Sequence, residues 1–308
     1  MHKNKLQKWI LWITGGLLLF SLLAILGISI KVGWVLTHPE RMRVAKTTIT
    51  GEQAYREFVF SSRRADVTLE AWYFPFLNSD KTVIFAHGYR KNRLQEDIPA
   101  LPLAMELRRN GYNILMFDFR AAGESGGNVT TIGQYEKDDL IGAVDFMKNM
   151  GRPGTHIGVI GFSMGAATSI IAAEADPRIE AVVADAPFAD LQEYLSDNLP
   201  YWSGLPAFPF TPAIINMMPL VLGLDPAQVS PVSAIKNVKA PVLLIHGNAD
   251  TAIPLTNSQK IHRAAPKNTT LWIVPGADHV GSYKIQPQEY LRRILEIFKQ
   301  LDDSRRAS

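Results

Sequence analysis

The sequence predicts an α/β protein built on a mostly parallel eight-stranded sheet with helices on both faces. Apolar, β-rich runs alternate with segments of helical period, which is typical of β-α-β crossovers. The first two runs have no helix between them, which predicts an antiparallel hairpin at one edge of the sheet. A long apolar segment comes before them and predicts one transmembrane helix ahead of the sheet.

Each strand is predicted from a short run of β-branched, aromatic or aliphatic residues bounded by turn residues. The eight runs are 57–61, 67–73, 82–86, 113–117, 156–161, 179–185, 241–246 and 270–274. Helices are predicted where apolar residues recur at helical spacing and a glycine or proline ends the pattern. They are 98–110, 132–150, 164–175, 257–264 and 287–301, with Gly111 and Gly151 directly after the first two.

The composition excludes several classes of protein. With 308 residues, 47% hydrophobic and 20% charged, the chain is neither disordered, nor collagen-like, nor a coiled coil. The absence of cysteine excludes disulfides, thiolate metal sites, a cysteine nucleophile and a lipidated cysteine anchor. No metal-ligand spacing and no dinucleotide or Walker glycine pattern is present, so we expect neither a metal nor a cofactor.

The net charge of +3 comes entirely from the N-terminal segment. Before the first acidic residue, Glu40, the chain holds Lys3, Lys5, Lys8 and Lys31. The remaining residues carry 28 basic and 29 acidic groups, a net charge of −1. A nucleic-acid partner is therefore not expected.

The predicted transmembrane helix is residues 9–30, which are 22 consecutive uncharged residues. As an α-helix they would span roughly 33 Å, about the thickness of a bilayer's hydrocarbon core. A cleaved signal peptide has a shorter apolar core, about 7–15 residues. We therefore expect an uncleaved anchor; a cleaved export signal and a buried core helix are the alternatives.

The lysines around this run predict its orientation. Three precede it and only Lys31 follows directly, which places the N-terminus inside the cell and the main domain outside the cytoplasm of a single-pass membrane protein. Trp9, Trp12 and Trp34 suit the two membrane interfaces. The predicted parts are a cytoplasmic N-terminus (1–8), the anchor (9–30), a juxtamembrane connector (31–54), the sheet domain (55–302) and a tail (303–308).

An insertion of about fifty residues, roughly 189–237, separates the sixth and seventh predicted strands. It is too apolar for a solvated loop, and long excursions in compact domains often serve as lids. We predict a lid over the substrate, whose lipophilic acyl site includes Trp202, Phe208, Phe210, Met217 and Met218. The alternative is that these side chains only pack the insertion onto the domain.

A candidate nucleophile lies in Gly161-Phe-Ser163-Met-Gly165, between a predicted strand and an alanine-rich helix. The G-x-S-x-G pattern alone is weak, but a sharp strand-turn-helix is the setting that a serine nucleophile requires. Glycines flank the serine because the strand and helix approach closely there.

The serine needs a base and an orienting acid. Of the seven histidines, His279 follows the last predicted strand, at the edge of the sheet where such folds bind ligands. His87 and His246 also end strands and are less favoured. Asp250 follows the preceding strand, which gives the chain order Ser163, Asp250, His279. The competing acids are Asp185, Asp190, Asp278 and Asp118.

Taken together, these residues resemble the α/β-hydrolase superfamily over about residues 55–300. The resemblance depends on His87-Gly-Tyr-Arg90, Asp118-Phe-Arg-Ala-Ala-Gly-Glu-Ser125, the Gly161–Gly165 turn, His246-Gly-Asn-Ala-Asp250 and Gly276-Ala-Asp-His279. The layout is similar to bacterial monoglyceride-lipase-like esterases and serine aminopeptidase-like hydrolases. One position departs from the common pattern: Ala121 stands where glycine is usual.

These residues predict a serine hydrolase with an acyl-enzyme intermediate that cleaves a carboxylic ester, small or lipid-like. The backbone N–H of Met164, at a helix N-terminus, would stabilise the oxyanion, and the resemblance implies the N–H of Tyr89 as the second donor. Arg90, Lys91 and Arg93 are expected to form a solvated rim, with an anion contact as the alternative. A peptidase, amidase or thioesterase with the same triad is the second hypothesis, and a catalytically silent binding protein is the third.

Overall fold

The computed structural model describes residues 2–44, 55–150 and 155–303. Helix α1 (His2–Thr37) contains the predicted anchor and continues seven residues beyond it. Within the described residues, Gln7–Thr37 is the one single helix long and apolar enough to span a membrane. Residues 45–54 of the predicted connector, the predicted helix end at Gly151 and residues 304–308 of the predicted tail lie outside the described residues.

The predicted fold class is confirmed: one mixed sheet has the strand order β1-β2-β4-β3-β5-β6-β7-β8. The strands are β1 (Arg56–Ser61), β2 (Thr68–Phe74), β3 (Lys81–Ala86), β4 (Asn113–Phe117), β5 (His156–Phe162), β6 (Ile179–Asp185), β7 (Val242–Gly247) and β8 (Thr269–Val274). The two earliest strands form the predicted antiparallel edge, and all pairs from β4 to β8 are parallel.

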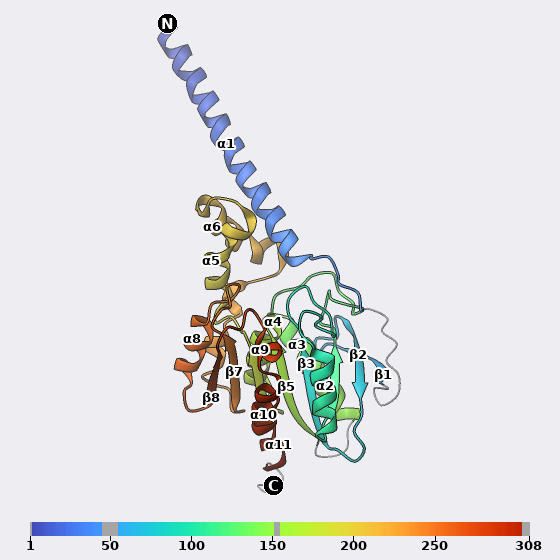
Figure 1. Ribbon diagram of the computed structural model, residues 1–308. Helices are drawn as coiled ribbons and strands as arrows, with labels where there is room; N and C mark the ends of the chain where they lie inside the picture. The colour runs from blue at the N-terminus through green and yellow to red at the C-terminus, as the bar shows by residue number, and fades with distance from the viewer. Residues whose placement is uncertain (1, 45–54, 151–154, 304–308) are drawn as a thin grey trace. The chain divides into compact units, whose positions relative to one another are not determined.

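Helices cover both faces of this sheet (Figure 1). On one face α2 (Ala100–Arg109) packs against α10 (Pro287–Phe298), beside the short α9 (Ser282–Ile285) and α11 (Gln300–Asp303). On the other, α3 (Glu136–Met150), α4 (Met164–Ala175), α7 (Pro231–Ala234) and α8 (Thr256–Ala264) pack in sequence. Alternation along a strand explains how one strand serves two layers: Val83 and Phe85 join the α2–α10 core, whereas Ile84 between them does not.

The described residues form two compact units. The first consists of α1 with the inserted segment Gln192–Pro226, and the second is His38–Leu191 with Ala227–Ser308, which contains the sheet. The insertion folds into most of α5 (Leu191–Ser203), α6 (Ala207–Met217) and the π-helical turn η2 (Met218–Leu222), and the chain then rejoins the sheet domain through the 3-10 turn η3 (Pro226–Gln228). The sequence did not indicate that the insertion packs with the N-terminal helix.

One predicted helix boundary is wrong. The segment predicted to be helical from Ile132 begins its helix at Glu136. Ile132 and Gly133 have positive φ angles of 50° and 117°, which no α-helix contains. The Glu136 carboxylate accepts hydrogen bonds from the backbone N–H groups of Thr131 and Gly133, both at 2.8 Å, and so holds this turn in a non-helical shape.

Candidate active site

Ser163 lies on a strained turn between β5 and α4. Its backbone has φ 54° and ψ −116°, a combination that non-glycine residues rarely adopt. The turn is held because the Ser163 N–H donates to the carbonyl oxygen of Asp185, at the end of the neighbouring strand β6, over 2.8 Å. The side chain of Ser163 thus projects at the carboxyl edge of the sheet, where the ends of β5, β6, β7 and β8 lie side by side.

Gly165 lets helix α4 start directly against strand β3. A Cβ atom at this position would lie 2.1 Å from the carbonyl oxygen of Ala86 and 2.6 Å from that of His87. Both are backbone atoms at the end of a buried strand, so they cannot rotate away as a side chain would.

We therefore expect Gly165→Ala to destabilise the protein by about 3 kcal/mol or more, at the upper end of overpacking costs. Gly88→Ala is the matched control, because a Cβ atom there would meet Gln95 and Ser163 only at 3.5 Å, an ordinary contact. Urea unfolding of the two variants in the same detergent measures the difference. Equal midpoints for Gly165→Ala and Gly88→Ala would contradict the packing argument.

The structure brings the three predicted triad side chains into one hydrogen-bonded chain. His279 Nε2 lies 2.9 Å from Ser163 Oγ, and His279 Nδ1 lies 2.8 Å from Asp250 Oδ2. These residues come from the turn after β5 and the loops after β7 and β8, so strand order alone places them at one edge. This geometry allows the imidazole to accept the serine proton while its other nitrogen donates to the carboxylate.

Asp250 is buried and its carboxylate is fully used. Oδ1 accepts the backbone N–H groups of Ala252 and Ile253 at 2.9 and 2.8 Å, while Oδ2 faces His279 and lies 3.4 Å from Nε2 of the buried His246. Burial by itself raises the pKa of Asp250, but the contacts with His246 and His279 outweigh it and hold the pKa below its usual range. Asp250 is therefore a carboxylate at neutral pH.

His246 supports Asp250 rather than facing the serine. Its Nδ1 accepts from the Ser258 hydroxyl and its Nε2 donates to the Ile253 carbonyl, both over 2.7 Å. The sequence marks His246 as a strand-end histidine but does not reveal this role. The His246-to-Asp250 spacing was the available signal, since the turn after β7 returns the aspartate to the histidine.

Three of the competing acids, Asp278, Asp118 and Asp185, make no hydrogen bond to His279 in the described part of the chain. Asp278 is exposed, although it adjoins His279 in sequence. Asp118 is bound to the side chain and backbone of Arg93. Asp185 is fully buried; its Oδ2 accepts from the Tyr290 hydroxyl over 3.0 Å, and its Oδ1 has no hydrogen-bond partner in the described part of the chain.

Burial raises the pKa of Asp185 to about 7, although its Tyr290 hydrogen bond and the nearby histidines act to lower it. The folded state thus holds a proton that an unfolded aspartate loses near pH 4. This group's contribution to stability is complete below pH 4 and is lost as the pH rises to about 7.

Asp185→Asn should remove that dependence, because the amide mimics the protonated acid and cannot ionise. Against wild type, we expect the free energy of unfolding of the variant to gain on the order of 3 kcal/mol between pH 5 and pH 8. Denaturant titrations at both pH values measure it. A constant difference across this range would mean that Asp185 does not hold the extra proton.

The loop after β3, which carries the predicted oxyanion donor Tyr89, is fixed by the side chains of Gln95 and His87. The Gly88 N–H donates to Gln95 Oε1 over 2.6 Å. His87 donates through Nδ1 to the Gly88 carbonyl and accepts the Phe119 N–H at Nε2, so it is neutral, and burial lowers its pKa. These bonds occupy both ring nitrogens of His87, whose side chain therefore holds the loop.

The prediction that Arg93 belongs to a solvated rim is wrong. Arg93 is buried, and two nitrogens of its guanidinium, Nη2 and Nε, donate to Oδ2 of Asp118 at 2.6 and 3.1 Å. The ion pair ties the loop after β3 to the loop after β4. Arg90 is exposed and Lys91, half-buried, pairs with Asp97 at 3.0 Å, so these two match the predicted rim.

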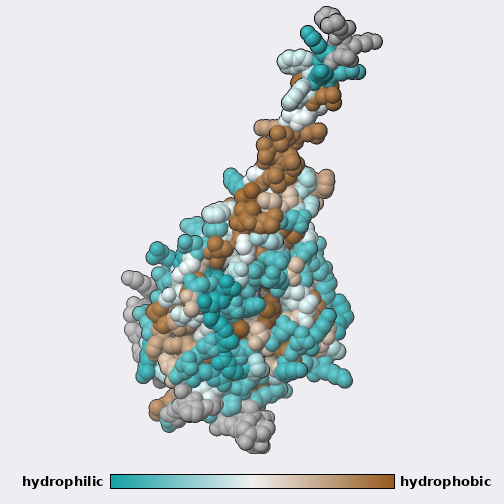
Figure 2. Space-filling view, turned by 180° about the vertical axis from the view of Figure 1, so that it is seen from behind, coloured by the Kyte–Doolittle hydropathy of each residue, from teal (hydrophilic) through white to brown (hydrophobic). Residues whose placement is uncertain are grey.

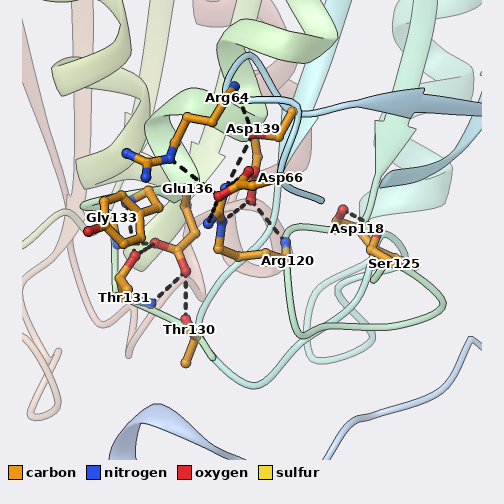
Figure 3. Close-up of polar contacts among 12 residues, drawn as sticks. Arg64, Asp66, Asp118, Arg120, Ser125, Thr130, Thr131, Gly133, Glu136 and Asp139 are labelled. Atoms are coloured by element: carbon orange, nitrogen blue, oxygen red, sulfur yellow. Dashed lines mark hydrogen bonds and ion pairs between the residues drawn. The ribbon is translucent and has the colours of Figure 1, made fainter. Parts of the chain in front are cut away.

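A buried polar cluster braces the loop after β4 (Figure 3). Arg120 donates to both carboxylate oxygens of Asp139 at 2.7 and 3.0 Å and also reaches Asp66 at 3.3 Å. Ala121, the departure from the family pattern, has φ 55°, so the turn keeps the left-handed geometry that favours glycine. Hydrogen bonds hold the turn at Ala121 in this geometry: those of Arg120 precede Ala121, and the bond from the Ser125 hydroxyl to the Asp118 carbonyl closes the loop.

A small surface hollow lies beside this loop. It is lined by Met164 and His87, by Arg90 and Lys91, by Phe119–Ala122 and Thr130, and by residues 39–42 of the juxtamembrane connector. The Arg41 guanidinium bonds the carbonyl oxygens of Ser125 and Gly127, which fixes the connector as one wall. The segment after the predicted anchor thus borders the turn that carries Ser163.

The five predicted acyl-site residues all belong to the unit formed with α1. Phe208 is exposed, Trp202 is 44% exposed and packs edge-on against Tyr194, and Met218 is fully buried. Their place in an acyl site stays a prediction. Among the described residues, no group of histidine, aspartate and glutamate side chains has the arrangement of a metal site.

Known proteins match this chain over most of the sheet domain. The profile of the prolyl oligopeptidase family matches residues 102–303, which include Ser163, Asp250 and His279. The uncharacterized protein YqkD of Bacillus subtilis (strain 168) is 32% identical over 229 residues, 74% of each chain. The uncharacterized protein YfhR of Escherichia coli (strain K12) is 26% identical over 223 residues, 70% of each chain. The esterase Pf2001 of Pyrococcus furiosus superposes with a TM-score of 0.71 at 31% identity and covers 86% of this chain and 98% of its own.

Proposed function

The chain belongs to the prolyl oligopeptidase family within the α/β-hydrolase superfamily, and from this premise we propose that it is a membrane-anchored serine hydrolase that cleaves lipophilic carboxylic esters. The observation that carries the proposal is the chain of hydrogen bonds from Ser163 through His279 to Asp250. The likeness to an esterase at 31% identity supports the ester as the scissile group.

In the proposed reaction, Ser163 Oγ attacks the ester carbonyl carbon as His279 Nε2 takes its proton. Asp250 keeps the proton on Nδ1, so that Nε2 is the free base, and stabilises the imidazolium that forms. The backbone N–H groups of Met164 and Tyr89 bind the oxyanion. His279 then protonates the leaving alcohol, and a water molecule deprotonated by His279 attacks the acyl-serine to release the acid and restore Ser163.

The substrate class is tested with the purified full-length protein in detergent. We expect fluorophosphonate labelling at Ser163 and turnover of aryl esters that rises with acyl chain length. Aminoacyl anilides and acyl thioesters, assayed in parallel, test the second candidate, a peptidase, amidase or thioesterase. The name of the matching family favours the peptidase. Labelling together with turnover of anilides but not of esters would overturn the ester assignment while leaving the serine hydrolase intact.

The anchor is tested on protein extracted from membranes. An intact mass that includes Trp9–Ile30 supports an uncleaved anchor, as the length of the apolar run predicts. A mass that begins after this run would instead identify an export signal.

A further inference from the structure

The carboxyl third of α1 has one buried face. Ser29, Gly33 and Thr37 are buried, and they recur every four residues, so they lie on one side of the helix. Residues 7–24 of the same helix are exposed all round. The helix therefore has two parts: a shaft, residues 7–24, which is exposed on all sides, and a carboxyl-terminal part that is covered on one side.

The covering element is the insertion. Helix α6 and the turn η2 pack on α1, and the contact is close because Gly33 has no side chain: a Cβ atom there would lie 2.7 Å from Leu222 Cδ1 and 3.8 Å from Met218 Cγ. Met218 is fully buried and Leu222 is 9% exposed. The insertion is thus fixed to the helix at Gly33.

This contact places the insertion at the end of the apolar run. The run ends at Ile30, and the covered side of the helix begins at Ile25 and Leu26, which are half-buried. At 1.5 Å per residue, that beginning lies about 8 Å inside the end of the run. An element packed from there to Thr37 lies at the level where a membrane-spanning helix leaves the hydrocarbon core. Figure 2 shows the hydrophobic colour along the shaft of α1.

The insertion itself exposes large apolar side chains. We define the insertion face as Tyr201, Trp202, Phe208, Leu220 and Val221, whose exposed fractions are 86, 44, 82, 81 and 47%. The 27 residues from Asn198 to Leu224 contain no charged side chain. Proteins in water rarely gather this much exposed apolar surface, whereas tyrosine and tryptophan are common at membrane interfaces.

We propose that the insertion face is a second membrane-contacting surface, which lies in the interface of the bilayer leaflet nearest the carboxyl end of α1. The inference rests on the anchor proposed above. Since Asn198–Leu224 has no charge, the contact is apolar and does not require anionic lipids. The segment predicted as a lid would then be held at the membrane surface, and a lipophilic substrate would reach it from the bilayer.

The absence of cysteine allows a direct test with matched leucines. Leu18→Cys, Leu220→Cys and Leu77→Cys each provide one thiol, at positions 72, 81 and 83% exposed. Leu77 precedes β3, at the edge of the sheet opposite Ser163. Each full-length variant is labelled with an environment-sensitive fluorophore in phosphatidylcholine vesicles that contain spin-labelled lipids, and retained fluorophosphonate labelling shows that it is folded.

We expect strong quenching at Leu18. At Leu220 we expect quenching by shallow spin labels that is at least about half as strong as that at Leu18 and stronger than that at Leu77. Labels at Leu220 and Leu77 that behave alike, with Leu18 quenched, would overturn the insertion face and leave the anchor intact. The insertion face would also be overturned if a second copy of the chain covers it. In that case the fluorescence of the Leu220 label would depend on protein concentration and not on spin-labelled lipid. Loss of quenching at Leu18 would overturn the anchor and the inference together, while the Ser163 activity would remain a separate result.

Discussion

Ser163→Ala should lower kcat by about 10⁵- to 10⁶-fold and abolish fluorophosphonate labelling. The hydroxyl is the only group of the described chain that lies within hydrogen-bond reach of His279 Nε2, at 2.9 Å, so no neighbouring side chain replaces it as nucleophile. His279→Ala should have nearly the same effect, because without the base the hydroxyl stays protonated. The double variant should be no slower than either single one, since the two residues act as a unit.

The measurement is ester turnover under saturating substrate, with labelling by a fluorophosphonate probe. Ser169→Ala is the control: this serine is also on α4, but its buried hydroxyl donates to the Gly165 carbonyl over 2.6 Å. It should keep both labelling and turnover. Ser163→Ala that remained within about tenfold of wild type would show that the chain hydrolyses esters at another site or not by a serine.

Asp250→Asn should lower kcat by about 10⁴-fold while leaving the fold intact. The reason lies in the four contacts of the carboxylate. The N–H groups of Ala252 and Ile253 require an oxygen at the Oδ1 position. An asparagine must therefore turn its NH₂ group toward His279 Nδ1, so Nδ1 becomes the acceptor and the imidazole proton moves to Nε2. A protonated Nε2 cannot accept the proton of Ser163.

Asp278→Asn is the matched control, since Asp278 adjoins His279 but is exposed. We expect its kcat to stay near that of wild type. The comparison also separates a tautomer effect from loss of folding: Asp250→Asn should still unfold cooperatively, at a lower temperature than wild type because it loses a carboxylate that the fold stabilises, whereas its turnover is lost. A variant with full turnover would mean that another carboxylate orients His279.

The order of strands and helices could be predicted because hydrophobic period and turn residues are local properties. The apolar run at residues 9–30, the alternation that gives eight strands and the glycines around Ser163 are all visible in the sequence. The proximity of Ser163, Asp250 and His279 could be predicted for a related reason. In a parallel sheet the residues that directly follow the strands lie at one edge, so three residues that each follow a strand are expected to lie close together.

Other features depend on contacts between residues far apart in the chain. The helix expected from Ile132 starts at Glu136 because the Glu136 carboxylate bonds the amides of the preceding turn. Arg93 is buried because Asp118, on the loop after β4, neutralises it. No local pattern shows which distant group each of these carboxylates bonds.

The sequence by itself determined the layers of the fold, the apolar helix ahead of it and the identity of the nucleophile, base and acid candidates. Only the tertiary structure decided that His246 supports Asp250, that Asp185 is buried against Tyr290 and that the insertion packs on α1 at Gly33. The physical reason is the distance along the chain over which each interaction acts. Period and turn chemistry act over a few residues, whereas burial, and with it the pKa of Asp185 and the close approach at Gly33, depends on which distant segments the fold brings together.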